Sequence, residues 1–125
     1  MEQSEFEEKV MEKILNSPEK PYCILKNQYL NATITSRKLT QVGFFTNFKV
    51  PNKLIVPGMK GLIMDVYAKF DNSDSTCLFI LFVRSGRIDF LEGVMSDGDR
   101  PSKYDKAILC YAFKDRRQHE IENYN

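Results

Sequence analysis

Glu92, a carboxylate at the end of an apolar strand, is the residue in this sequence best suited to chemistry. Ile88 and Phe90 alternate with polar residues, and the same alternation places Glu92 on their face. A carboxylate that enters an apolar face needs a partner or acquires a raised pKa. Arg37 is an attractive partner, and the pair would form a binding or acid–base site in a cleft. In the other interpretation the strand ends at Gly93, and Glu92 caps a backbone N–H or faces water.

Other side chains on the neighbouring segments are candidates for the lining of such a cleft. Thr46 alternates with Phe44 and Phe48, so its hydroxyl either lines a pocket or bonds a nearby carbonyl. Tyr29 would reach the same cleft from a helix. Phe45 belongs to a partly exposed aromatic set of the kind that anchors protein partners. The predicted binding residues are Glu92, Arg37, Thr46, Tyr29 and Phe45.

The spacings that catalytic and metal sites need are missing from the sequence. His119 is the only histidine, so a Ser-His-Asp or Cys-His arrangement would need distant partners. Cys23, Cys77 and Cys110 show no Cys-x-x-Cys spacing of the kind that zinc sites use. The basic cluster at residues 114–119 is broken by an acid and is narrower than a nucleic-acid surface. We therefore predict no catalytic residue, no metal, no cofactor and no nucleic-acid partner.

One or two N-terminal helices are expected to cover a sheet. Ser4 and Glu7 have the spacing of a capping box, in which each side chain bonds a free backbone N–H of the first turn. A second short helix is predicted with Pro21 as its first residue, where the missing N–H costs nothing; a strand is the alternative for this segment. Apolar residues follow Ser4 at helical spacing: Phe6, Val10, Met11, Ile14 and Leu15.

Strand patterns begin at residue 33. The β-branched, polar segment 33–39 predicts an exposed edge strand. A period of two, with mainly apolar residues at the even positions of 42–50 and 62–70, predicts half-buried strands. The dipeptide Ser85-Gly86 predicts a tight hairpin turn, because glycine supplies the positive φ that such turns need.

Two segments, 77–83 and 107–113, are apolar on both faces, so we expect both inside the sheet with covered sides. Short β–β connections favour antiparallel pairing. The chain is therefore predicted to be a single α+β domain, with helices on a curved, mostly antiparallel sheet of about five to six strands. The predicted parts are a helical segment at 1–31, the sheet at 32–113 and a polar tail at 114–125.

Composition narrows the functional classes. A chain of 125 residues with a formal net charge of +1 shows no electrostatic surface for nucleic acid or anionic membrane. Its longest apolar run is too short to span a bilayer as a helix, and its N-terminus is acidic rather than that of a signal peptide. Three cysteines cannot all pair within one chain, which fits a reducing compartment. We predict a cytoplasmic protein without membrane partners.

Two motifs carry a family resemblance. Arg37 to Phe48 has the form Arg-x-x-Thr-x-Val-Gly-Phe-Phe-Thr-x-Phe, and Leu91-Glu92-Gly93 follows the hairpin. Across residues 25–93 the chain resembles a group of small, uncharacterised bacterial proteins. The resemblance attaches no reaction to the chain, and it links the chain loosely to immunity or accessory proteins of bacterial toxin systems. The aromatic stretch ending in Trp-Pro that follows Leu-Glu-Gly in the group is absent here.

Two functional hypotheses follow. The first is a protein-interaction module without catalysis that binds a protein partner, such as a toxin, or a second copy of itself. An exposed aromatic set such as Phe45, Tyr67 and Tyr111 would serve as its anchors. The alternative is a small-ligand-binding or catalytic domain with a sheet–helix cleft lined by Glu92 and Arg37.

Overall fold

One antiparallel sheet dominates the fold. A computed structural model describes residues 1–71, 73–104, 106–113 and 119–125, and among them the sheet has seven strands. The strands are β1 (Thr33–Leu39), β2 (Gly43–Lys49), β3 (Lys60–Phe70), β4 (Thr76–Arg84), β5 (Arg87–Met95), β6 (Ala107–Tyr111) and β7 (Glu120–Glu122). Their order is β1-β2-β5-β4-β3-β6, and β7 also pairs with β3. Every pairing is antiparallel.

Helix α1 (Gln3–Ile14) packs on the sheet through the predicted apolar stripe. Its buried apolar side chains are Phe6, Val10, Met11 and Ile14. The predicted capping box is wrong, because the helix has Glu2 at its N-cap and no side-chain cap. Glu7 therefore does not cap the helix, and its carboxylate bonds another part of the fold.

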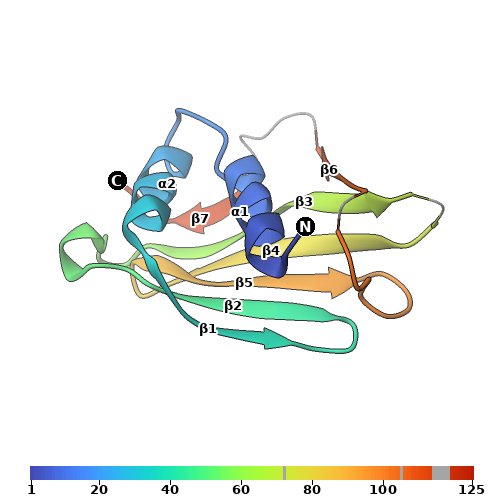
Figure 1. Cartoon of the computed structure of the whole chain (residues 1–125). Helices are drawn as coiled ribbons and strands as arrows, with labels where there is room; N and C mark the ends of the chain where they lie inside the picture. The colour runs from blue at the N-terminus through green and yellow to red at the C-terminus, as the bar shows by residue number, and fades with distance from the viewer. Residues whose placement is uncertain (72, 105, 114–118) are drawn as a thin grey trace.

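Helix α2 (Tyr22–Asn31) confirms the helical interpretation of this segment. Pro21 stands at its N-cap, and Tyr22, Leu25 and Gln28 form its buried face. Figure 1 shows both helices on the same face of the sheet, with α1 above its centre and α2 nearer one end. The predicted α+β class, with N-terminal helices packed on a mostly antiparallel sheet, is confirmed.

A buried glutamine joins α2 to the sheet. Gln28 is 1 % exposed. Its Nε2 donates to the carbonyl oxygens of Leu54 at 2.9 Å and Gly86 at 3.0 Å. Its Oε1 accepts the backbone N–H of Ile88 at 2.9 Å. The side chain thus bonds the short 3-10 helix η1 (Asn52–Leu54) and the β4–β5 hairpin at once.

The predicted hairpin between β4 and β5 is confirmed. Ser85 and Gly86 both have positive φ, 54° and 82°, as a two-residue type I′ turn requires. The prediction that β4 has both faces covered is wrong. Its alternate side chains from Cys77 to Val83 are buried under the helices, whereas Leu78, Ile80 and Phe82 are only half-buried. The layer on the helix side is the only one that covers the described part of the sheet (Figure 1).

Segment 107–113 was also predicted inside the sheet, and this is wrong. Its strand, β6, pairs only with β3 among the described strands and forms an edge. Ile108 is 62 % exposed and Phe113 is 55 % exposed. An apolar segment of this length does not report how many strands flank it, so its pattern could not separate a central strand from an edge.

The opposite edge of the sheet is β1, as predicted. All of its side chains from Thr33 to Leu39 are exposed. In the polar tail, Glu120–Glu122 forms β7 on the Lys60 end of β3. Residues 114–118, which carry most of the predicted basic cluster, lie outside the described residues.

Two glycines set the close packing of β2 on β5. A Cβ on Gly43 would overlap the carbonyl oxygen of Gly93, and a Cβ on Gly93 would overlap the ring of Phe44. Both glycines belong to the two motifs that carry the family resemblance. Their role here is to let a buried aromatic ring lie against a neighbouring backbone.

Candidate interaction surface

The sheet face opposite the helices carries a continuous apolar surface, here called the open face. Cross-strand pairs run across it from β2 through β5 and β4 to β3, and residues paired in this way point to the same side. Its apolar members are Phe45, Leu62, Tyr67, Leu78, Ile80, Phe82, Phe90 and Val94. Each is half-buried, because its neighbours in the sheet cover part of it.

Aromatic rings form the centre of the open face. Phe82 and Phe90 are cross-strand partners whose rings stack with centroids 4.3 Å apart and planes 17° apart. The ring of Phe45 lies 6.1 Å from that of Phe90. The guanidinium of Arg84 lies 5.3 Å and 5.2 Å from the Phe82 and Phe90 centroids. Ring contacts of this kind add to the energy of area burial, and large aromatic surfaces with a neighbouring Arg are typical of protein interfaces.

Glu92 is the carboxylate within this apolar surface. Its cross-strand neighbours are Phe45 on β2 and Ile80 on β4, and Phe90 and Val94 flank it along β5. Glu92 is half-buried, and among the described residues it makes no side-chain hydrogen bond or ion pair. The structure therefore bears out its position on an apolar face, and the described residues provide no partner for its charge.

The expected pairing of Glu92 with Arg37 is wrong. Arg37 is the cross-strand partner of Thr46, which lies under the helices, whereas Glu92 pairs with Phe45 on the open face. A bulge also separates Glu92 from Ile88. The β4–β5 register shifts so that Phe82 pairs with Phe90 while Val83 pairs with Ile88, and the extra residue sends Ile88 into the core.

On the helix side, Arg37 binds Glu7 of α1. The guanidinium donates from Nε to Oε2 at 2.7 Å and from its terminal nitrogen to Oε1 at 2.9 Å, a two-point contact. Gln3 donates a further hydrogen bond to Glu7 at 2.7 Å. Glu7 is 3 % exposed, and its hydrogen bond raises the pKa of Arg37. This pair ties the edge strand β1 to α1, which is a structural role.

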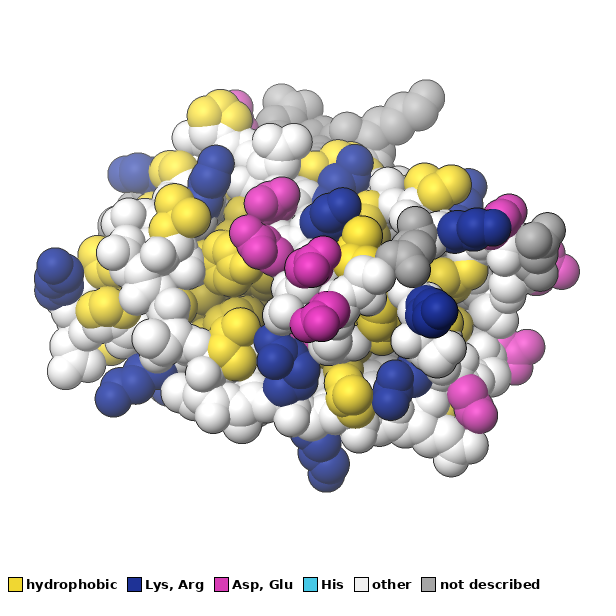
Figure 2. All heavy atoms as spheres, in the orientation of Figure 1, with side chains coloured by type: hydrophobic (Ala, Val, Ile, Leu, Met, Phe, Trp, Pro, Cys, Tyr) yellow, Lys and Arg dark blue, Asp and Glu magenta, His cyan; other side chains and the backbone are white. Residues whose placement is uncertain are grey.

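Thr46 and Tyr29 also lie on the helix side, apart from Glu92 and Phe45. The Thr46 hydroxyl is buried without a hydrogen-bond partner among the described residues. Burial, followed by the charges of Glu8 and Glu12, raises the pKa of Tyr29 to about 12. Figure 2 shows hydrophobic side chains at the floor of a hollow between α2 and α1, with acidic side chains along α1 at its rim. The five predicted binding residues are thus divided between two faces.

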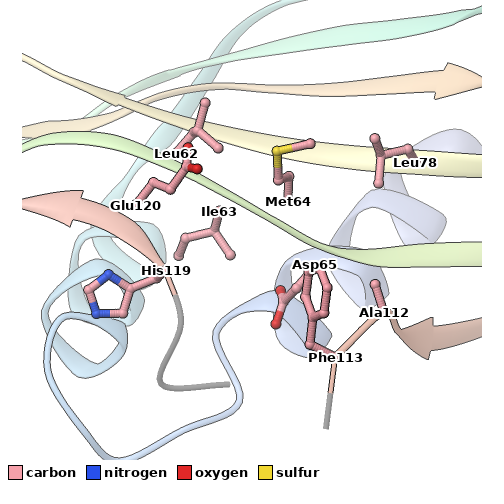
Figure 3. Close-up of a pocket in the computed structure, with 9 residues that line it drawn as sticks. All are labelled: Leu62, Ile63, Met64, Asp65, Leu78, Ala112, Phe113, His119 and Glu120. Carbon is pink, nitrogen blue, oxygen red and sulfur yellow. The ribbon is translucent and has the colours of Figure 1, made fainter. Parts of the chain in front are cut away.

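A pocket of about 470 Å³ continues the open face at β3. It lies where β3 passes from its pairing with β7 to its pairing with β6. Leu62 and Leu78 of the open face form part of its wall, and Asp65 and Phe113 also line it (Figure 3). A volume of this order suits a small ligand or a partner's side chain.

His119 borders this pocket but has a structural environment. Its ring lies on the α2 side (Figure 3), in edge contact with Tyr22 and Tyr124 at centroid distances of 5.8 Å and 5.5 Å. Its Nδ1 accepts the backbone N–H of Ile121 at 3.1 Å, so this nitrogen carries no proton. Burial disfavours the charged imidazolium, so it lowers the pKa of His119 and favours the neutral ring.

Sequence reasoning missed Phe82, Phe90 and Arg84 as surface residues, because a strand that is apolar on both sides was interpreted as doubly covered. The hairpin register gave no signal, because a two-residue turn at Ser85-Gly86 would pair Phe82 with Asp89, and the bulge in β5 pairs it with Phe90 instead. Gln28 was missed entirely, and its pattern on α2 offers no signal for a buried polar side chain. Of the predicted anchors, Phe45 and Tyr67 lie on the open face. Tyr111 lies on the helix side, where its hydroxyl donates to the carbonyl of Lys13.

Comparison of the chain with protein-family models, curated proteins and solved structures gives no match. The resemblance to small bacterial proteins therefore stays a prediction. Within the described ranges, no three His, Cys, Asp or Glu side chains gather into a set that could hold a metal ion. In the same part of the chain, neither α-helix has the length and apolar character needed to cross a bilayer.

Proposed function

We propose that this chain is a protein-interaction module without catalysis, which binds its partner through the open face. The supporting observation is the stacked Phe82–Phe90 pair, with Phe45 beside it, on a sheet face that no described helix covers. Monomeric proteins rarely leave a large continuous apolar patch in contact with water. The centre of this patch has the aromatic residues and the Arg that interfaces favour.

The pocket at β3 extends the same surface. An apolar side chain of the partner would fit between Leu62 and Leu78, with Asp65 and Glu120 at the pocket wall. Anchor residues that enter a pocket commonly carry much of an interface's binding energy. A partner that presents an apolar group at this position would complement the pocket.

The experiment compares two variants in which an apolar side chain is replaced by lysine. Phe45→Lys places a charge on the open face, and Leu30→Lys places one on α2, where Leu30 is 70 % exposed. Each chain is used to capture proteins from a lysate of the source cells. We then purify those that the native chain and Leu30→Lys retain and Phe45→Lys does not. Calorimetry on the purified pair is expected to show at least about a tenfold loss of affinity for Phe45→Lys alone. Equal affinity for all three chains would refute the proposal.

The family resemblance suggests one version of this function, an immunity or accessory protein whose partner is a bacterial toxin. The genes next to this one test that version. A large secreted toxin encoded beside it, whose purified toxic domain binds the native chain and not Phe45→Lys, would support it. A neighbourhood of metabolic genes only would count against it.

A small-ligand function is the second candidate, and it now rests on the β3 pocket rather than on a cleft between Glu92 and Arg37. The pocket volume of about 470 Å³ lies within the range of small-molecule sites. A small-molecule screen monitored by amide chemical shifts tests it. Hits whose shifts centre on Leu62 and Leu78, and which Leu78→Trp abolishes, would favour this function over the interaction module.

A further inference from the structure

We infer that the open face is covered by the open face of a second copy of this chain, with Arg84 of each copy opposite Glu92 of the other. This inference rests on the proposed function, because it names the partner of the same surface. The two sheets would pack face to face across a two-fold axis. Sheets in β-sandwiches pack in this way, about 10 Å apart.

Two charges of opposite sign, Arg84 and Glu92, support this partner. Lys38 and Arg87 lie on the same face as the cross-strand partners of Phe45 and Arg84. Arg84 and Glu92 each lack an ion pair within the described part of the chain. Asp89, on the same hairpin, is already bonded to Arg87 at 3.2 Å. A partner that covers the aromatic centre removes water from Arg84 and Glu92, which is unfavourable unless it supplies opposite charges. A second copy supplies both a carboxylate and a guanidinium.

The register places the backbone positions of Arg84 and Glu92 on opposite sides of the aromatic pair, and the Arg84 guanidinium reaches back over its two rings. On the open face, successive cross-strand rows of β4 and β5 are Arg84–Arg87, Phe82–Phe90 and Ile80–Glu92, with the bulge at Asp89 between the first two. A two-fold axis that lies parallel to the face and passes over the middle row exchanges the two outer rows. Arg84 of one copy then lies over the row that contains Glu92 of the other. In a symmetric dimer the reciprocal contact forms at the same time.

The geometry also matches a common mode of sheet packing. Neighbouring strands are about 4.8 Å apart, and the two outer rows are about 13 Å apart along the strands. Bringing Arg84 directly over Glu92 of the partner copy therefore makes the strands of the two copies cross at roughly 40°, close to the angle of about 30° in aligned sandwiches.

Charge does not oppose the association of two copies. The formal net charge is +1, so long-range repulsion between copies is small. In the dimer, the Phe82–Phe90 pairs of the two chains would form a dry centre, and the reciprocal Arg84–Glu92 contacts would lie on either side of it. Such an arrangement of aromatic anchors and matched charges is what fixes the orientation of an interface.

Sedimentation velocity of the full chain over a range of concentrations tests the inference. The native chain is expected to dimerise. Arg84→Glu and Glu92→Arg, each alone, place two like-charge contacts in the symmetric dimer, and each is expected to weaken it roughly a hundredfold or more. An equimolar mixture of these two variants restores both contacts, so it is expected to form a heterodimer about as tightly as the native dimer.

Controls on the helix side carry the same changes in charge. Lys26→Glu and Glu19→Arg alter exposed residues of α2 and of the loop before it, and both are expected to dimerise like the native chain. If either reversal disturbs folding by circular dichroism, the neutral variants Arg84→Gln and Glu92→Gln replace them, and each is expected to weaken the dimer without abolishing it.

Three results would overturn the inference: a native chain that stays monomeric at about 1 mM, reversals that dimerise as well as the native chain, or a mixture that stays monomeric. The proposed function fails separately. If the native chain is monomeric but the Phe45→Lys variant selectively loses a different purified protein, the open face is an interaction surface whose partner is not a second copy. If both experiments are negative, the proposed function and the dimer both fail.

Discussion

Replacing Gln28 with methionine tests how α2 is held on the sheet. Gln28 is buried, and its amide bonds the carbonyls of Leu54 and Gly86 and the N–H of Ile88. Methionine has nearly the same length and volume, so Gln28→Met removes the three hydrogen bonds without opening a large cavity. The expected loss of stability therefore comes from polar groups that are left buried without partners.

The magnitude follows from counting those groups. The Gly86 carbonyl keeps a second donor, the N–H of Val56 at 2.9 Å. The Leu54 carbonyl and the Ile88 N–H lose the partner that Gln28 provided. Each unsatisfied buried group costs roughly 1 to 3 kcal/mol, so the free energy of unfolding is expected to fall by about 2 to 6 kcal/mol. For a chain of 125 residues, a loss of 2 kcal/mol corresponds to a fall in Tm of about 8 °C.

Thermal and urea unfolding measure this change. The same substitution at Gln41, whose side chain makes an exposed hydrogen bond to Asp99, is the control and is expected to cost less than about 0.5 kcal/mol. A third variant, Gln28→Glu, keeps an acceptor for Ile88 but points a carboxylate at two carbonyl oxygens. Burial and these oxygens raise the pKa of that carboxyl above its unfolded value, so the variant should be most stable at low pH and lose stability as pH rises through its folded pKa. The reasoning is refuted if Gln28→Met costs no more than the control at Gln41.

Three other predictions concern single side chains. Thr46→Val removes a buried hydroxyl without a partner and is expected to raise the free energy of unfolding by about 1 kcal/mol, whereas a loss of stability in urea titration would mean that the hydroxyl is bonded. His119 has a lowered pKa, so its contribution to stability is complete above about pH 6.5 and is lost as pH falls through its folded pKa; Tm profiles of the native chain and His119→Gln should therefore diverge with pH, and parallel profiles would contradict this assignment. Glu92→Gln is expected to leave Tm within about 2 °C, since the carboxylate has no partner in the described chain; unfolding of that variant would identify Glu92 as a structural residue.

The local elements were largely predictable because their signals are local. Ser85-Gly86 needs positive φ at both positions, and few backbone turns satisfy that requirement. The apolar spacing of α1 identifies its buried stripe wherever the helix docks. Strand β2 follows its alternation for the same reason, since side chains along a strand point to opposite faces by geometry.

The site was less predictable, because its residues come from strands that are distant in sequence. Glu92 was correctly placed on an apolar face, but its pairing with Arg37 failed because the pattern of one strand cannot show which face it shares with another strand. The bulge before Phe90 illustrates the difficulty. One inserted residue reverses the side on which Ile88 lies, and nothing in the alternation of that segment announces it.

The sequence alone determined the class of fold, the two helices, the hairpin and the apolar strands, because each depends on backbone preferences and spacing within a few residues. Only the tertiary structure decided which side of those strands the helices cover. It also decided that Arg37 binds Glu7, and that Glu92 lies beside the aromatic rings of the open face. These outcomes depend on where α1 and α2 dock, which is fixed by packing between segments far apart in the chain.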